Sequence, residues 1–322
     1  MKTCLKILAT LAIASSAATA LPARAAWPER PVTVVVPFPP GGPTDLVARV
    51  LAKQLADQTG QSFVVENKGG ANGNIGMQYA ASAKPDGYTV LYNTSSIALS
   101  PNLYRNLPFD PLRDFTPISM LANVPSVLVA RKDFPVQTMP EFVSLVKANP
   151  GKYTMALGAI GSSLHMAGER MKMLAGLDIL NVPYKGTSPA VTDLLGGQVD
   201  MMFASSLNAL PHIKSGALKA LGVTSPQALP QFPGVPPIGD TIKGFESNAW
   251  FALFGPAKLP ADTLATLNAA ARKAVDTPEF RQLLEREAAM AVSSSPQELD
   301  AFVRKDIERY AEIVKYTGAT VD

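Results

Sequence analysis

The sequence predicts an α/β protein of two lobes with largely parallel sheets. Short runs rich in β-branched and aromatic residues alternate along the chain with helix-length amphipathic runs, an order typical of strand–helix–strand units. The chain has 322 residues, a length that usually makes two lobes of ordinary domain size. Helix starts are also well marked, by sequences that cap an amino-terminal turn.

Nine runs are predicted to be strands, and in chain order they are 32–37, 63–66, 88–92, 127–130, 153–157, 179–184, 199–203, 218–223 and 250–254. Capping boxes at Thr138–Glu141 and Ser295–Glu298 predict two helix starts, and Ser188 before Pro189 predicts a third. Residues 229–239, rich in proline and glycine, are expected to form an ordered loop or a connection between the lobes.

Residues 1–25 have the features of a cleaved secretory signal. Lys2 and Lys6 come first, the apolar run 5–20 follows, and the small-x-small sequence 23–25 suits signal peptidase. The run is too short for a confident membrane span, so we expect a soluble, exported, periplasmic protein. Cys4 precedes the apolar run, whereas a lipidated cysteine would follow it, and we therefore do not expect a lipoprotein.

The charge and cysteine content of the exported part exclude several classes of function. Without Lys2, Lys6 and Arg24 the 29 basic residues become 26, which equals the 26 acidic residues, so nucleic acid is a poor partner. Without Cys4 the chain has no disulfide, thiol nucleophile or cysteine ligand. We expect no cofactor and no metal.

The stretch "PFPPGGPTDLVARVLAKQL", residues 37–55, joins a strand to a helix through Gly41 and Gly42. Thr44 or Asp45 is expected to cap that helix, whose apolar positions share one face and are Leu46, Val47, Val50, Leu51 and Leu55. Such a turn directs unpaired backbone N–H groups and the positive end of a helix at an anion. The alternative is that the glycines only turn the chain.

The same plan occurs a second time in residues 153–176. A strand is followed by "GAIG" and by Ser162-Ser163 as the expected helix cap, and the predicted buried face consists of Leu164, Ala167, Met171 and Leu174. A weaker third instance leads through Lys185 and Gly186 into a helix at Pro189. If the first two instances belong to different lobes, their helix ends can face each other across a cleft and bind a ligand with one or two carboxylates.

Common catalytic signatures are missing from the sequence. "GGANGNIG" lacks the spacing of a dinucleotide fingerprint, no P-loop follows either glycine turn, and no serine lies in G-x-S-x-G. The two histidines, His165 and His212, are too far apart for common zinc spacings. A hydrolase using Ser162 and His165 remains an alternative, although residues three apart on a first helical turn more often act as cap and ligand donor.

Several stretches in matching order together resemble one family, and they are "WPERPVTVVVPFPPGGPTDLVAR", "GGANGNIG", "KPDGYTVLYNTSS", "LGAIGSSLHMAGE", "VPYKGTSPAVTDLLGGQVD" and "LKALGVTSP". They look like the Bug-type extracytoplasmic receptors of tripartite tricarboxylate transporters. The resemblance implies a two-lobe periplasmic binding protein fold, type II-like, with the ligand cleft between the lobes. We assign 26–124 and 247–322 to the first lobe and 125–246 to the second.

The resemblance also implies ligand-binding residues. The turn after the first strand would contact a ligand carboxylate through Phe38, Pro40, Gly42, Thr44 and Asp45. The family's Gly-x-Gly-Ser-x-x-His pattern maps onto Gly158, Ala159, Gly161, Ser162 and, shifted by one residue, His165. Here the chain departs from the pattern, because an extra residue separates the glycines, and Lys68-Gly69 replaces the more usual Arg-Pro.

Six further positions are expected at the ligand: Asn72, Ser95 and Ser96 in the first lobe and Tyr184, Asp200 and Ser205 in the second. Alternatives stay open for some of them, since Ser95-Ser96 could cap a helix, Asp200 could hold a loop, and Asp45 could cap its own helix. The expected function is capture of a mono- or dicarboxylate by a monomer whose lobes close, followed by delivery to a membrane permease. A membrane sensor kinase is the alternative partner.

Overall fold

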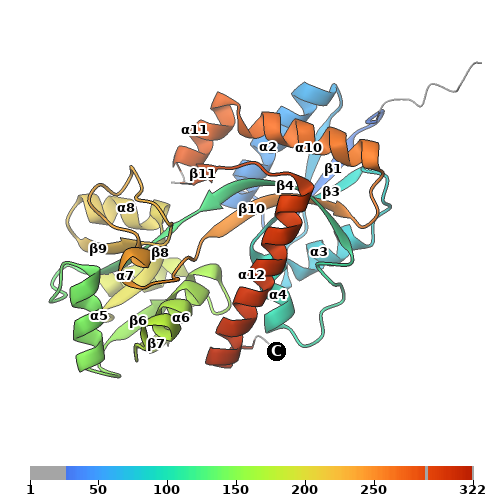
Figure 1. Ribbon diagram of the computed structural model, residues 1–322. Coiled ribbons are helices and arrows are strands. Elements are labelled where there is room, and N and C mark those ends of the chain that lie inside the picture. The colour runs from blue at the N-terminus through green and yellow to red at the C-terminus, as the bar shows by residue number, and fades with distance from the viewer. Residues whose placement is uncertain (1–26, 287–288, 321–322) are drawn as a thin grey trace, which may run out of the picture.

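The computed structural model describes residues 27–286 and 289–320, so the predicted signal at 1–25 lies outside the described residues. The described chain forms two separate sheets, each packed with helices on both faces (Figure 1). No helix in this part of the chain is long and apolar enough to cross a membrane.

The first sheet has the strand order β11-β4-β10-β3-β1-β2. Its strands are β1 (Val32–Val36), β2 (Phe63–Asn67), β3 (Thr89–Thr94), β4 (Phe115–Val124), β10 (Ala249–Pro256) and β11 (Met290–Ala291). β1 pairs in parallel with β2 and β3, whereas β10 is antiparallel to β3 and β4. The helices of this lobe are α2 (Pro43–Thr59), η2 (Ala71–Gly73), α3 (Asn74–Ala81), α4 (Ser96–Leu103), α10 (Ala261–Val275), α11 (Pro278–Arg286) and α12 (Pro296–Thr317).

The second sheet has the order β7-β6-β8-β5-β9. Its strands are β5 (Ser126–Arg131), β6 (Thr154–Leu157), β7 (Leu180–Pro183), β8 (Met201–Ser205) and β9 (Leu218–Val223), and its helices are α5 (Met139–Ala148), α6 (Ser163–Ala175), α7 (Thr187–Leu195), α8 (Ser206–Lys214) and α9 (Ile238–Thr241). β6, β7 and β8 are mutually parallel, and β5 is antiparallel to both of its neighbours.

All nine predicted strands are present, but the expectation of largely parallel sheets is wrong. Each sheet has only two parallel neighbour pairs, β1 with β2 and β3 in the first and β6 with β7 and β8 in the second, and its other neighbours are antiparallel. In the first sheet the chain leaves through β4 and re-enters through β10, so these two neighbours run in opposite directions. β4 and β11 were not predicted. The chain passes between the sheets at Val124–Ser126 and again between Val223 and Ala249, and the exact lobe boundaries stay a prediction.

The capping boxes predicted at Thr138 and Ser295 are confirmed, with reciprocal bonds to Glu141 and Glu298. The cap predicted at Ser188 is wrong, because α7 already begins at Thr187 and its N-cap is Gly186. The proline-rich segment 229–239 is an ordered loop that leads into α9, and it buries Leu229 and Phe232 in the second lobe.

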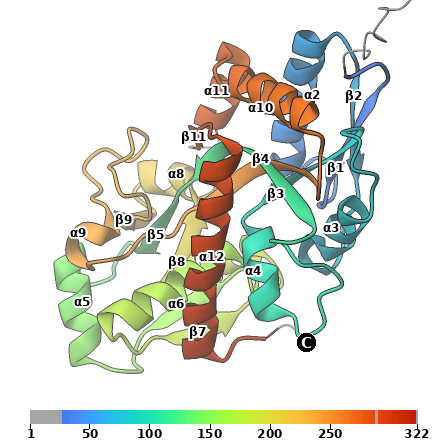
Figure 2. The same ribbon diagram turned by 45° about the vertical axis from the view of Figure 1, so that its right-hand side comes forward.

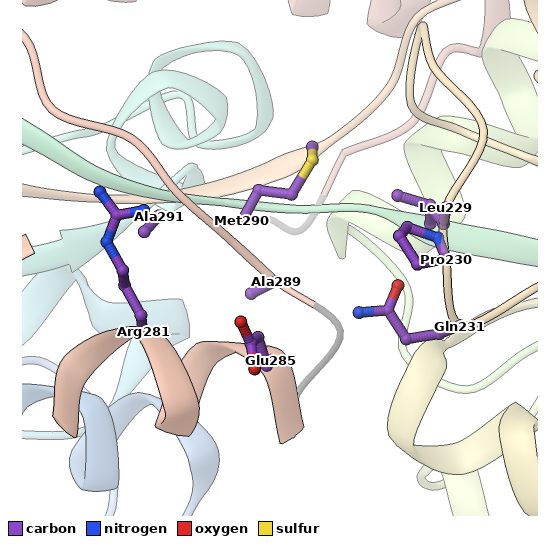
Figure 3. Close-up of a pocket in the computed structure, with 8 residues that line it drawn as sticks. All are labelled: Leu229, Pro230, Gln231, Arg281, Glu285, Ala289, Met290 and Ala291. Carbon is purple, nitrogen blue, oxygen red and sulfur yellow. The ribbon is translucent and has the colours of Figure 1, made fainter. Parts of the chain in front are cut away.

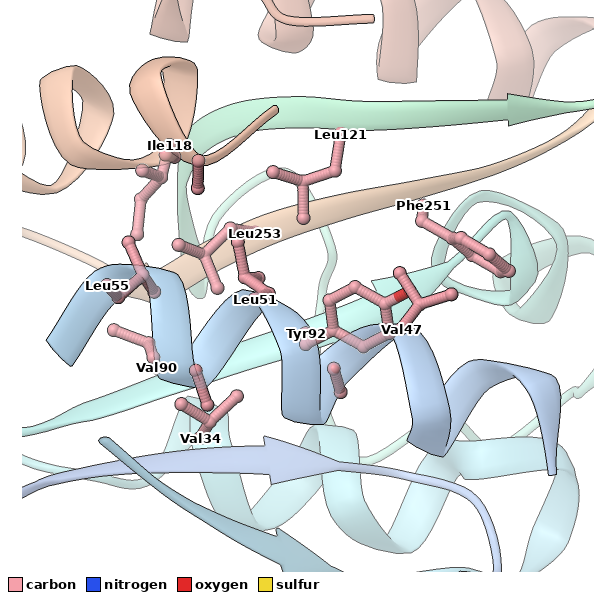
Figure 4. Packing of buried hydrophobic residues seen from close by; sticks show 14 of the residues in the cluster. Val34, Val47, Leu51, Leu55, Val90, Tyr92, Ile118, Leu121, Phe251 and Leu253 are labelled. Carbon is pink, nitrogen blue, oxygen red and sulfur yellow. The ribbon is translucent and has the colours of Figure 1, made fainter. Parts of the chain in front are cut away.

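The predicted apolar face of α2 packs onto the first sheet. Val47, Leu51 and Leu55 are fully buried in a cluster with Val34 and Val90 (Figure 4). Full burial of each such side chain contributes about 1.5–3 kcal/mol. Leu46 does not join this face as expected, because it is 45% exposed in the first turn.

One helix connects the lobes along their length. α12 belongs to the first lobe, yet it lies against both α4 and α6 (Figures 1 and 2). Met166 of α6 is fully buried in the first lobe's cluster with Trp250. The two crossings of the chain are tied by Thr224, whose hydroxyl accepts from Ser126 N at 2.8 Å and lies 3.0 Å from Asn248 Oδ1.

Candidate ligand-binding site

The carboxyl ends of the parallel strands of both sheets lie on the side where the chain crosses between the lobes. In the first sheet Thr94, the last residue of β3, pairs with Phe251 near the start of β10, and Ala249 pairs with Val124 at the crossing. In the second sheet Ser205, the last residue of β8, pairs with Ser126, the first residue of β5. Ligands of open α/β sheets bind at such carboxyl ends.

Six helices of the described chain begin at these ends, three from each sheet. α2, α3 with η2, and α4 follow β1, β2 and β3, and α6, α7 and α8 follow β6, β7 and β8. We call the strand ends, the loops and the first helical turns together the cleft edges. α2 and α7 begin after Gly42 and Gly186 with no side-chain cap, so the N–H groups of their first turns, other than those that Pro43 and Pro189 lack, have no capping side chain.

The carboxylate of Asp45 is buried and holds the first turn together. Its Oδ2 accepts from Gly41 N and from Arg49 Nε, both at 2.9 Å, and its Oδ1 accepts from Asn67 Nδ2 at 2.9 Å. Asn67 Nδ2 also donates to Phe38 O at 3.0 Å. The cap expected from Thr44 or Asp45 is therefore wrong, because the N-cap of α2 is Gly42, and the carboxylate of Asp45 positions the turn.

Desolvation alone would raise the pKa of Asp45, but the hydrogen bonds from Arg49, Gly41 and Asn67 lower it below its ordinary value. The carboxylate thus stays ionised at neutral pH. A carboxylate without partners at this place would repel an anionic ligand. The hydrogen bonds from Gly41, Arg49 and Asn67 reduce that repulsion.

Glycines let the first turn pack closely on the loop after β2. A Cβ on Gly76 would lie 2.8 Å from Pro37 Cβ and 2.7 Å from Lys68 O, and a Cβ on Gly69 would lie 3.4 Å from Pro39. Phe38, Pro40, Gly42 and Thr44 lie on this turn, and Asn72 lies on the adjoining loop with a positive φ of 54°. The structure thus places the expected residues that follow β1 next to the segment that follows β2.

Ser95 and Ser96 lie at the third strand end, but their hydroxyls are used inside the lobe. Ser96 Oγ donates to Asn93 Oδ1 at 3.1 Å, and Ser95 hydrogen-bonds to Tyr310 of α12. Both residues are buried, and Ser95 makes no capping bond although it is the N-cap of α4. These contacts favour a structural role for the pair.

In the second lobe the expected cap of α6 is confirmed. Ser162 Oγ accepts from His165 N at 3.2 Å and donates to Ala159 O at 2.8 Å. Gly161 has φ of 74° and Gly158 lies against α7, where a Cβ would come within 3.0 Å of Thr187 Cα. The starts of α6 and α7 are therefore adjacent.

His165 lies beneath the turn, where both ring nitrogens face groups of the second lobe. Its Nδ1 accepts from Gly161 N at 3.1 Å, and its Nε2 lies 3.7 Å from Glu169 Oε1. Burial lowers the pKa of His165, an effect that Lys172 increases and Glu169 opposes. His165 therefore remains neutral and positions the Gly161 backbone.

This histidine belongs to a buried polar cluster that the sequence analysis missed. Glu169 Oε1 lies 2.6 Å from Lys172 Nζ and accepts from Asn181 Nδ2 at 2.7 Å. The cluster borders a cavity of about 440 Å³ that also reaches Ile160 and Thr317. The spacing of His165, Glu169 and Lys172 on one helix face is a signal that could have identified it.

Of the remaining expected residues in the second lobe, Tyr184 and Ser205 lie on the cleft edge. Tyr184 Oη donates to Asp193 Oδ2 at 2.7 Å, and Ser205 Oγ caps α8 by accepting from Asn208 N at 3.4 Å. Asp200 lies at the start of β8, the opposite edge of the sheet, where it accepts from Arg131 Nε at 3.0 Å and from Thr154 N at 2.9 Å. Asp200 therefore lies a full strand away from the cleft edge, a position that does not favour the expected contact with the ligand, and that contact stays a prediction.

A separate groove of about 530 Å³ runs between the lobes beside β11 (Figure 3). Arg281 and Glu285 of α11 and Met290 of β11 line it from the first lobe, and Leu229 to Gln231 line it from the second. We call it the β11 groove. None of the cleft-edge residues lines it.

Comparison with known proteins gives concordant results. The family model described as "Tripartite tricarboxylate transporter family receptor" matches residues 47–319. Protein BugT of Bordetella pertussis is 36% identical over 319 residues, which cover 98% of this chain and 98% of BugT.

Solved structures of similar proteins share the fold. The periplasmic binding protein BugD is 37% identical with a TM-score of 0.73, covering 91% of this chain and 99% of BugD. A protein of R. palustris solved with adipate is 33% identical with a TM-score of 0.76, covering 91% and 99%. Another protein, from Rhodopseudomonas palustris and solved with bound malate, is 34% identical with a TM-score of 0.70, covering 89% and 100%.

Proposed function

The chain belongs to the tripartite tricarboxylate transporter receptor family, and on that premise we propose that its two lobes close on a small carboxylated solute and present it to the membrane subunits of such a transporter. The protein is a periplasmic solute-binding receptor with the two-lobe fold of that family. Similar proteins solved with adipate and with malate support a carboxylate as the solute.

The observation that carries the proposal is the convergence of helix starts on the two cleft edges. The partial positive charges of these helix ends and the uncapped first turns of α2 and α7 favour a carboxylate over a neutral solute. We propose contacts from Phe38, Pro40, Gly42, Thr44 and Asn72 in the first lobe. In the second lobe the proposed contacts are Gly158, Ala159, Ser162, Tyr184 and Ser205.

Closure supplies the mechanism. A solute held by one lobe alone is bound weakly, whereas a solute that also meets the helix starts of the other lobe stabilises the closed arrangement by its differential affinity for that state. We propose that the permease recognises this closed form, that the receptor acts as a monomer, and that residues 1–25 are removed on export.

We further propose that binding involves no catalysis. Ser162 Oγ bonds to the backbone of Ala159 and His165, and the imidazole of His165 bonds to Gly161 N and lies near Glu169. A nucleophilic serine requires its hydroxyl to bond to the base, and these two side chains are each engaged elsewhere.

The test is calorimetry and thermal shift on the purified protein, unfolded and refolded to remove carried-over solute, against mono-, di- and tricarboxylates, amino acids and neutral sugars. A ligand at about 100 times its Kd adds about 2.7 kcal/mol of stability, which raises the Tm by a few degrees. Stabilisation by sugars but by no acid would contradict the proposal.

A matched pair of variants tests where the carboxylate of the ligand binds. Lys185 is exposed on the cleft edge, and Lys132 is exposed at the far end of β5, on the opposite edge of the same sheet. We expect Lys185→Gln to weaken carboxylate binding by about two- to fivefold, in the range of an exposed ion pair, and Lys132→Gln to leave it unchanged.

A further inference from the structure

The chemical class of the solute can be narrowed from the side chains of the cleft edges, given the proposed function. His165 is neutral, and the charged side chains in the described loops and first helical turns there are Asp45, Lys68 and Lys185. Asp45 is engaged as described, and Lys68 Nζ lies 2.6 Å from Glu66 Oε1 and 4.0 Å from the ring centroid of Tyr79. Lys185 is therefore the one ammonium group on the described cleft edges that is left for a ligand.

Large apolar side chains are exposed on the same edges. Leu46 and Ile75 from the first lobe and Ile160 and Leu207 from the second are between 45% and 58% exposed. Each lies in the first turn of a helix or in the loop that leads into it, and Ile75 Cδ1 lies directly over Gly70, 2.6 Å from the place of a Cβ on that glycine. Apolar surface gathered on a polar rim is typical of ligand-binding grooves.

Three polar side chains on these edges are used within the protein. The hydroxyls of Ser162, Tyr184 and Ser205 bond to Ala159 O, Asp193 and Asn208 N, respectively. A ligand hydroxyl buried against these three groups, or against the exposed apolar side chains, would lose its bonds to water without a partner in exchange, which costs about 1–3 kcal/mol per group.

We propose that the solute is a mono- or dicarboxylate with an apolar body, either an unbranched alkyl chain or an aromatic ring. Its carboxylates are held by the helix starts and by Lys185, and its body lies against the exposed apolar side chains of the two edges. Polyhydroxylated acids and tricarboxylates are disfavoured by the same surface.

The experiment compares the affinities of several acids by isothermal titration calorimetry on the refolded full chain, and its central pair has equal charge and length. Adipate and galactarate share one carbon chain, but galactarate carries a hydroxyl on every internal carbon; benzoate, malate and citrate complete the series. We expect adipate or benzoate to bind at least about tenfold more tightly than galactarate and citrate. Tighter binding of galactarate, malate or citrate would overturn this inference and leave the proposed function intact, whereas no binding by any acid would overturn the proposed function itself.

Variants test which side chains meet the apolar body. Ile160→Asn and Leu207→Asn are expected to weaken adipate or benzoate binding by about three- to tenfold, since each removes apolar contact. Leu195→Asn is the control, because Leu195 is also exposed but ends α7, away from the cleft edge. Unchanged affinity in both cleft variants would overturn the assignment of these side chains.

Discussion

The buried carboxylate of Asp45 is the side-chain group that fixes the turn between β1 and α2. Asp45→Ala would leave Gly41 N, Arg49 and Asn67 without their shared acceptor. We expect a loss of about 1–3 kcal/mol in the free energy of unfolding, measured with urea, and weaker carboxylate binding because the turn is no longer fixed.

Asp57→Ala is the matched control on the same helix. Asp57 is exposed, and within the described chain its one ion pair is with Lys53, at 3.4 Å, so its removal is expected to change stability by less than about 0.5 kcal/mol. Equal effects of the two substitutions would contradict the positioning role of Asp45.

His165 makes stability depend on pH. Its pKa is lowered below 6.5 in the folded protein, so below pH 6.5 the unfolded chain binds more protons than the folded one. The contribution of His165 to the free energy of unfolding should therefore be at its maximum above pH 6.5. It should fall as the pH drops toward the folded-state pKa, with a slope of at most about 1.4 kcal/mol per pH unit.

Urea unfolding at pH 7.5, 6.5 and 5.5 measures this slope. His165→Asn is expected to flatten it, whereas His212→Asn should retain the wild-type slope. If His165→Asn keeps the full decrease, other groups cause it and the neutral, buried state of His165 is wrong.

At the scale of elements, the spacing between α6 and α7 is set by Gly158. A Cβ at this position would lie 3.0 Å from Thr187 Cα and 3.1 Å from Thr187 Oγ1, both in the first turn of α7. Gly158→Ala should push the two helix starts apart and weaken carboxylate binding by about tenfold, as measured by calorimetry.

Gly196→Ala serves as the comparison at the other end of α7. Gly196 has φ of −77°, and the nearest atom to an added Cβ is 3.4 Å away, so alanine is tolerated there. Affinity that falls equally in both variants would indicate a general effect on the lobe and not on the helix starts.

The sequence predicted elements whose signals are local. β-branched runs identified the strands, and Thr138, Ser162 and Ser295 identified helix starts, because each cap is completed within four residues. β4 escaped prediction because its run mixes Pro117, Ser119 and Asn123 with apolar residues and is fixed by pairing with β10, more than a hundred residues later.

The functions of individual site residues were less predictable for the same reason. Asp45, His165 and Asp200 have partners that only the fold brings together, such as Asn67, Glu169 and Arg131. Sequence spacing shows that a polar residue follows a strand or a glycine turn, but it does not show which partner its side chain contacts.

At the scale of the whole molecule, the ligand cleft and the β11 groove lie on opposite sides of the chain crossing. In the first sheet β11 is beyond β4 on one side, and β3, β1 and β2 are on the other. In the second sheet β9, which precedes the 229–231 loop, is beyond β5, and β8, β6 and β7 are on the other side. We therefore expect a rotation about the crossing that narrows the proposed cleft to widen the β11 groove.

Under the proposed lobe closure, contacts in the β11 groove are expected to stabilise the open arrangement. Met290 of the first lobe packs against the second lobe's apolar cluster, and this contact would be lost on closure. Met290→Ala should remove that contact, and Ala291→Trp should act as a wedge. Both are expected to favour the closed state and to tighten carboxylate binding by about two- to tenfold, equivalent to about 0.4–1.4 kcal/mol.

Small-angle X-ray scattering and calorimetry together test this coupling between the β11 groove and lobe closure. The ligand-free Met290→Ala and Ala291→Trp variants should have a smaller radius of gyration than the wild type, and both should have a lower Kd for the best acid. Gln282→Trp is the control, because Gln282 is on the same helix as Arg281 but lines a pocket confined to the first lobe. The wedge and the lost contact act on the groove in different ways, so tighter carboxylate binding in both variants would show that opening the groove drives closure. Weaker binding in either variant would contradict the proposed rotation about the chain crossing.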